Sequence, residues 1–167
     1  MDFIYWLLGK PESVTAEIMS LHHPGMPMDN GVAILRYPNG PVVEIACSFT
    51  NHATENTTEI IGEQGSIVQN FGDGPSCNVP RPPGGIALKW FLKKDGQWTD
   101  SGLQSPPSHG VRIATLAEPI AQFVKGERGP IATVEEGRDV LRLVLACHVS
   151  TREGRRVFLD DAKIDAM

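Results

Sequence analysis

The sequence has no excess of basic residues and no long hydrophobic run. Lysine and arginine number 15 against 20 aspartate and glutamate residues, which gives a net charge of −5 at pH 7. Such a chain offers no basic surface for nucleic acid or for an anionic membrane. No apolar run approaches the ~18 residues that span a bilayer, and the first residues lack the basic lead and cleavage site of a signal peptide. We therefore expect a cytoplasmic protein that binds neither nucleic acid nor membrane.

Cysteine is scarce, and the familiar catalytic motifs are missing. The sequence has three cysteines, Cys47, Cys77 and Cys147. Their number is odd, they lie far apart in the sequence, and they form no Cys-x-x-Cys pair. The sequence therefore predicts neither a disulfide framework nor a metal site. Cys47 and Cys147 lie in apolar runs and are predicted to be small core residues. No Gly-x-Ser-x-Gly, His-Glu-x-x-His or P-loop motif occurs, so the residues alone indicate no active site.

What the sequence does contain is a long series of short strands. The chain has 167 residues, enough for one domain with a sizeable core. Asn39-Gly40 between the apolar runs 32–37 and 42–49 is a strong hairpin signal, because both residues tolerate positive φ. A further strand is predicted at 14–18. Two more hairpins are predicted, one of 57–61 with 66–70 around Gly62 to Gly65, and one of 86–92 with 97–99 around Asp95-Gly96. Strands joined by hairpins are antiparallel.

Helical patterns occur at the two ends of the chain. A short helix is predicted over 2–8, ended by Gly9. Apolar residues recur at helical spacing over 113–124, where Pro119 either starts or kinks a helix. Thr133 and Glu136 form a capping box ahead of a long helix that ends at Gly154. A last strand is predicted at 155–159.

Strands followed by helices predict an α+β domain over residues 1–160, with a polar tail at 161–167 that frays. We expect an open, mostly antiparallel β-sheet with helices packed on one face. The strands at 32–35 and 42–49 are apolar on both faces, so the second face also needs cover. A partner chain is the simplest cover, and we predict a homodimer or homotetramer through that face.

Four polar residues are candidate substrate-binding residues. His22 and His23 lie in a predicted loop; the alternative is a plain polar loop, because adjacent residues rarely face one ligand. Asn51 and His52 follow a strand end, where polar groups can contact a substrate hydroxyl; a simple loop is again the alternative. His148 has core spacing on the long helix and is predicted to be structural.

Several segments carry a family resemblance when they are taken together. They are Asp2 to Gly9 ending in Trp-Leu-Leu-Gly, Asp29-Asn30-Gly31, Gly62-Glu63-Gln64-Gly65, Val134 to Leu141, and Ser150 to Val157. In this order and spacing they resemble the C-terminal domain of the Gfo/Idh/MocA oxidoreductases, the family of glucose–fructose oxidoreductase and inositol dehydrogenase. The family's domain is an open, mostly antiparallel sheet with helices on one face, which agrees with the pattern of strands and helices.

The resemblance implies that this chain is one half of a longer protein and that the other half binds the cofactor. Family members bind NAD or NADP in an N-terminal Rossmann domain, which also carries a Glu-Lys-Pro lysine. An Asp-x-x-x-His pattern precedes the helix that ends Trp-Leu-x-Gly, so both would fall before Met1. Lys10-Pro11 follows Gly9 rather than Glu and is not the family's lysine. No catalytic or cofactor-binding residue is therefore assigned in this chain.

We expect the chain to be the substrate-binding and oligomerisation domain of an NAD(P)-dependent oxidoreductase. The small-molecule substrate of the parent is expected to be a sugar, a polyol or a related hydroxy compound. The isolated chain is expected to be inactive and not to bind NAD. The alternative is a stand-alone assembly or small-ligand-binding module without redox activity.

Overall fold

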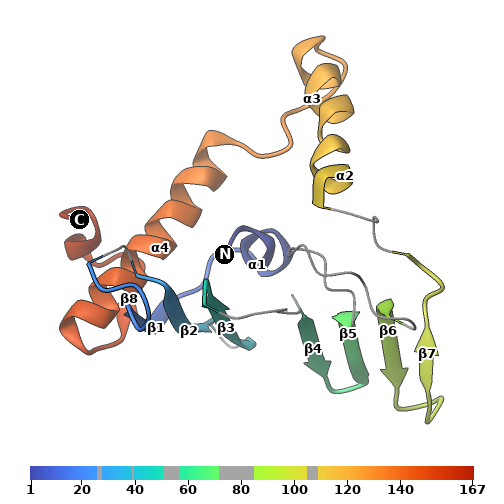
Figure 1. Cartoon of the computed structure of the whole chain (residues 1–167), viewed down its shortest axis with the longest axis horizontal. Helices are drawn as coiled ribbons and strands as arrows, with labels where there is room; N and C mark the ends of the chain where they lie inside the picture. The colour runs from blue at the N-terminus through green and yellow to red at the C-terminus, as the bar shows by residue number, and fades with distance from the viewer. Residues whose placement is uncertain (26–27, 39, 51–56, 72–84, 105–108) are drawn as a thin grey trace. The chain divides into compact units, whose positions relative to one another are not determined.

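The computed structural model describes residues 1–25, 28–38, 40–50, 57–71, 85–104 and 109–167. The chain divides into two compact units. The first unit consists of Met1–Thr50 and Ile131–Met167, and the second unit is Asn51–Pro130. Each unit contains a four-stranded sheet in which neighbouring strands are antiparallel (Figure 1). The α+β class and the antiparallel pairing predicted from the sequence are confirmed.

The first unit contains both ends of the chain. Its elements are α1 (Asp2–Leu8), β1 (Ser13–Met19), β2 (Asn30–Arg36), β3 (Val42–Ser48), α4 (Val134–Glu153), β8 (Val157–Phe158) and the 3-10 helix η1 (Ala162–Ile164). The strands form the first sheet in the order β3-β2-β1-β8. Thr133 caps α4 reciprocally with Glu136, and Gly154 ends it at φ 61°. The predicted capping box and glycine stop are confirmed.

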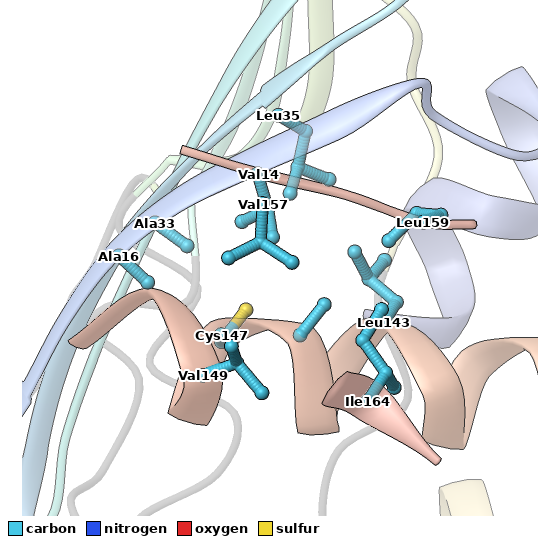
Figure 2. Packing of buried hydrophobic residues seen from close by; sticks show 11 residues of the cluster. Val14, Ala16, Ala33, Leu35, Leu143, Cys147, Val149, Val157, Leu159 and Ile164 are labelled. Carbon is cyan, nitrogen blue, oxygen red and sulfur yellow. The ribbon is translucent and has the colours of Figure 1, made fainter. Parts of the chain in front are cut away.

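The hydrophobic core of the first unit lies between α4 and one face of the first sheet. Because side chains alternate along a strand, Val14, Ala16, Ala33 and Leu35 share the face that α4 covers. Figure 2 shows Val14 and Val157 pointing toward the helix that carries Leu143 and Cys147. Small residues on both sides, such as Ala16, Ala33 and Ala146, let the helix approach the strands closely.

Hydroxyl groups of α4 satisfy the edge of β1 that β8 leaves open. The short strand β8 pairs only with Ser13 and Val14. Farther along β1, the N–H of Ala16 donates to Ser150 Oγ at 2.9 Å, and the Thr151 hydroxyl donates to the Ala16 carbonyl at 3.0 Å. Ser150 in turn donates to the carbonyl of Arg155 at 2.6 Å. The helix is thus held to the sheet by directional bonds as well as by apolar contact.

The last residues are anchored to this core rather than fraying as a polar tail. Ile164 of η1 is 1% exposed and belongs to the core cluster. Arg142 of α4 donates to the carbonyl of Leu159 at 2.7 Å and pairs with the carboxylate of Asp165. The composition of 161–167 is polar, but a buried isoleucine and ion pairs hold it, since Asp161 also pairs with Arg155 and Lys163 with Glu153.

The second unit holds the second sheet and two short helices. Its strands are β4 (Thr58–Gly62), β5 (Gly65–Phe71), β6 (Ile86–Leu92) and β7 (Trp98–Asp100), in that order across the sheet. Gly65 is required in the β4–β5 hairpin, because a Cβ there would collide with the carbonyl oxygen of Phe91. The strand pairings β2–β3, β4–β5 and β6–β7 are those of the three predicted hairpins.

The helical pattern predicted over 113–124 belongs to two helices, α2 (His109–Ala114) and α3 (Ala117–Val124). Pro119 lies in the first turn of α3, where its missing N–H costs no hydrogen bond. Within the part of the chain that the structure describes, no helix is long and apolar enough to cross a membrane.

One core prediction is wrong. Cys147 is buried, and burial raises the pKa of its thiol to about 11. Cys47 is exposed instead. Its partner across the ladder is Gly31, which has no side chain to cover the thiol. Cys77 lies outside the described residues.

Candidate functional site

The best candidate site is the polar end of the first sheet, where β1 ends, β2 begins and β3 ends. The strand register sets Met19 opposite Asn30 and Asn30 opposite Ser48. We define the polar end as His22, His23, Asp29, Asn30, Ser48 and Thr50. Asn30 and Ser48 share a sheet face with Val32 and Ala46, so the polar end borders the face that α4 does not cover.

Asp29 organises this end. Its carboxylate is only 5% exposed, and protein donors replace the water that it loses on burial. Oδ1 accepts the N–H of Leu21 at 2.9 Å and the side-chain amide of Asn30 at 2.7 Å. Oδ2 accepts the N–H groups of His22 and His23 at 3.1 and 3.0 Å. These donors, with the Leu21 N–H first, hold the pKa of Asp29 well below its usual range.

The ring of His23 is attached to the same carboxylate. Its Nδ1 lies 3.0 Å from Asp29 Oδ2, while the side chain stays 50% exposed. The ring of His22 stands edge-on to it, with the centroids 4.9 Å apart. Residues 21–23 therefore fold against Asp29, and the two imidazoles lie together.

A short chain of hydroxyl and amide groups continues across the sheet from Asp29. The Asn30 amide lies 3.4 Å from the Thr50 hydroxyl, which lies 2.9 Å from the Ser48 hydroxyl. The N–H of Thr50 donates to Ser48 Oγ at 3.0 Å. Amides and hydroxyls can both donate and accept, so this row can exchange hydrogen bonds with the hydroxyl groups of a ligand.

Two of the four predicted site residues, His22 and His23, lie at the polar end. Asn51 and His52, which follow Thr50 directly, lie outside the described residues. The sequence reasoning missed Asp29, Asn30, Ser48 and Thr50 as site residues. A polar pair at the start of an otherwise apolar strand was the signal available for Asp29 and Asn30.

A second region, a hollow of about 440 Å³ beside α4, is less suited to bind a ligand. Its lining includes Arg138, Asp139, Arg142 and Asp165. Arg138 pairs with Asp139 at 2.9 Å, and Arg142 pairs with Asp165. The charges of these four residues are paired within the protein, whereas the hydroxyl groups of the polar end keep lone pairs that can accept further hydrogen bonds.

The described residues do not fit a dinucleotide or a metal ion. The N-terminus of a long helix is the usual anion site for a pyrophosphate. At α4, however, the Glu136 N–H already donates to Thr133 Oγ1, and the carboxylates of Glu135 and Glu136 occupy the first turn. Their negative charge would repel a phosphate. No group of three or more His, Cys, Asp or Glu side chains that could hold a metal occurs among the described residues.

Comparison with known proteins gives one family match. The family model for the GFO/IDH/MocA C-terminal domain matches residues 1–68. No curated protein matches the chain.

Solved structures share the fold over nearly the whole chain. The aldose–aldose oxidoreductase from Caulobacter crescentus, complexed with glycerol, is 18% identical with a TM-score of 0.71, covering 94% of this chain and 44% of that one. An oxidoreductase from Agrobacterium radiobacter, in complex with NAD+, L-tartaric acid and magnesium, is 20% identical with a TM-score of 0.69, covering 95% and 46%. The WlbA dehydrogenase from Bordetella pertussis, in complex with NADH and UDP-GlcNAcA, is 21% identical with a TM-score of 0.63, covering 94% and 41%.

The chain therefore spans somewhat less than half the length of these three structures. At such identities the likeness establishes the fold. It agrees with the family match over the first 68 residues.

Proposed function

We propose a function on the premise that the chain is a Gfo/Idh/MocA C-terminal domain, matched by the family model over residues 1–68 and by its fold over the remainder. The chain is the substrate-binding and oligomerisation domain of an NAD(P)-dependent oxidoreductase. Its substrate is a sugar, a polyol or a related hydroxy compound.

The observation that carries this proposal is the polar end of the first sheet. The buried carboxylate of Asp29 holds the Asn30 amide and the His23 ring, and the hydroxyl groups of Thr50 and Ser48 continue from that amide. Such a row suits a ligand that presents several hydroxyl groups. The three solved relatives named above are described with glycerol, with L-tartaric acid and with UDP-GlcNAcA, and these names agree with a hydroxylated ligand.

The redox chemistry belongs to the other part of the parent enzyme. A nicotinamide cofactor exchanges a hydride with a C–OH group. This chain's residues bind and orient the substrate: the Asn30 amide and the Thr50 hydroxyl form hydrogen bonds with its hydroxyl groups. The structure of α4 offers no place for the pyrophosphate, so we propose that the isolated chain does not bind NAD and has no activity alone.

The proposed partner in the oligomer is a second copy of the chain, on the uncovered face of the first sheet. Val32 and Ile34 there are 44% and 43% exposed, and Val42 lies beside them. Glu44 stands opposite Ile34 across the ladder, and Arg36 stands opposite Val42. Glu17 stands opposite Val32 on the other side, so carboxylates of β1 and β3 flank the apolar residues of β2. Such a face, with Arg36 at one end, can pair with itself in a twofold interface that sets carboxylates against the guanidinium of the second copy.

A ligand titration tests the substrate role. We expect D-glucose or myo-inositol to shift the amide resonances of Asn30 and Thr50 in a spectrum of the 167-residue chain, and Thr50→Val to weaken that binding. Ser101→Ala, in the second unit, is the matched loss of a hydroxyl and should leave it unchanged. NAD binding with a micromolar dissociation constant by calorimetry would overturn the assignment of the cofactor to the other half. Shifts confined to the second unit would overturn the site.

Light scattering tests the oligomer. At tens of micromolar we expect a dimer or tetramer, and Ile34→Asp should convert it to a monomer by burying an unpaired charge. Ile131→Asp places the same charge on an exposed position outside the strands and serves as the control. A clean wild-type monomer, or equal dissociation by both variants, would contradict the proposed interface.

A further inference from the structure

The contact between Asp29 and His23 fixes more than the shape of a loop. A carboxylate in its ionised form has acceptors and no proton to donate. Asp29 is in that form, because three backbone N–H groups and the Asn30 amide all donate to it. The ring nitrogen that faces it at 3.0 Å must therefore be the donor.

This requirement selects one tautomer of the neutral ring. A neutral imidazole carries a single proton, so a proton on Nδ1 leaves Nε2 with a bare lone pair. No hydrogen bond joins Nε2 of His23 to any residue that the structure describes, and half of the side chain is exposed. Nε2 is thus a hydrogen-bond acceptor held in a fixed orientation and open to a ligand.

His22 provides an internal contrast. Its backbone N–H donates to the same Asp29 oxygen as that of His23, at 3.1 Å. Its ring packs edge-on against the ring of His23, but none of the described hydrogen bonds joins it to a carboxylate. The two residues share the anchoring of the backbone, and only His23 has its ring tautomer set.

We propose that His23 accepts a hydrogen bond from a hydroxyl group of the substrate through Nε2, and that Asp29 is the positioning residue that sets the tautomer for this contact. The proposal rests on the proposed function for the class of ligand, and on the Asp29–His23 geometry for everything else. The role differs from that of Asn30 and Thr50, whose amide and hydroxyl can donate as well as accept.

Nuclear magnetic resonance of the free chain tests the tautomer without any ligand. Two-bond proton–nitrogen correlations distinguish a protonated ring nitrogen from a bare one. At the alkaline end of a pH titration we expect His23 to show a protonated Nδ1 and a bare Nε2. In Asp29→Asn, the side-chain amide can donate to the ring, and the share of the opposite tautomer should rise. A wild-type His23 with its proton on Nε2, or with both tautomers equally populated, overturns the proposal even if the variant fails to fold.

Binding tests the hydroxyl contact. With myo-inositol as the probe, the carbon-bound ring protons of His23 should shift, and His23→Phe should raise the dissociation constant about threefold to tenfold, the loss of one neutral hydrogen bond. Ser101→Ala, in the second unit and outside the polar end, should change it by less than about twofold. Equal weakening in both variants overturns the contact.

The two proposals fail in different ways. The wrong tautomer refutes the role of Asp29 and leaves the substrate-binding domain standing. The expected tautomer with no resonance shifted by myo-inositol or D-glucose refutes the proposed ligand class, and with it the hydroxyl contact.

Discussion

The two sheets of this chain are built alike and covered differently. Each has four antiparallel strands joined largely by hairpins. In the first sheet, Val14, Leu35 and Val157 are fully buried beneath α4. In the described part of the second unit, Val68 is the one buried hydrophobic residue, while Ile61 and Trp98 are 77% and 50% exposed. The strands of the second sheet also carry many apolar residues, but no described helix packs along them as α4 does along the first.

The difference shows that apolar strands do not make a core by themselves. The first sheet has one because α4 brings Leu143, Ala146 and Cys147 against it at helical spacing, and because Ala146 and Cys147 are small enough for close approach. The free energy of folding should therefore reside mostly in the first unit. Three changes test this contrast.

Truncation of the core of the first unit should have the largest effect. Leu143 is 1% exposed on α4, and Leu143→Ala should lower the free energy of unfolding in urea by about 2–5 kcal/mol, because it leaves a cavity. Leu141→Ala on the same helix, at a residue 57% exposed, should cost less than about 0.5 kcal/mol. Ile61→Ala, on the second sheet, should be equally mild.

Similar losses for Leu143→Ala and Ile61→Ala would mean that the second sheet is covered as fully as the first. That outcome would refute the contrast between the two units.

Loss of the hydroxyl contact between α4 and β1 should come next. Ser150→Ala deprives the Ala16 N–H of its acceptor in a buried place, at a cost of about 1–3 kcal/mol. Hydrogen exchange at Ala16 should accelerate together with the fall in stability. Ser101→Ala is the control on the second unit, where the hydroxyl accepts one exposed N–H, and it should cost less than about 0.5 kcal/mol. Unchanged exchange at Ala16 would show that another group satisfies that strand edge.

Local patterns predicted most elements of the fold. The Thr133–Glu136 capping box and Gly154 place both ends of α4, and the glycine-containing turns place three hairpins. These signals act between residues close in sequence, which is why the sequence shows them. The exposure of Cys47 and the burial of Ile164 depend instead on residues far along the chain, Gly31 and the α4 core, and no local pattern shows them.

The candidate site could be predicted only in part, for the same reason. Two adjacent histidines in a polar loop were visible as a possible site. What gives them a fixed place is Asp29, which lies beyond them in the chain and is buried only when β1, β2 and β3 are paired. A single aspartate before a strand looks like any loop residue until its donors are known.

The smallest of the three effects is a change in stability at low pH, and it compares Asp29 of the first unit with Asp100 of the second. The pKa of Asp29 is lowered by the donors around it, first by the Leu21 N–H. A carboxyl group with a lowered folded pKa contributes stability above its unfolded value of about 3.9, and that stability is lost as the pH falls through the folded value. Asp29→Asn should therefore be less stable than wild type at neutral pH, and the gap should narrow from about pH 5 downward. Asp100→Asn, at the end of β7, removes a carboxylate that accepts one exposed N–H, from Gly102, so its difference in stability from wild type should be smaller throughout.

Urea unfolding across this pH range measures the difference in stability from wild type for both variants. A constant gap for Asp29→Asn would show that the Asp29 donors fix the loop without favouring the charged carboxylate, and the argument for the tautomer of His23 would then lose its premise.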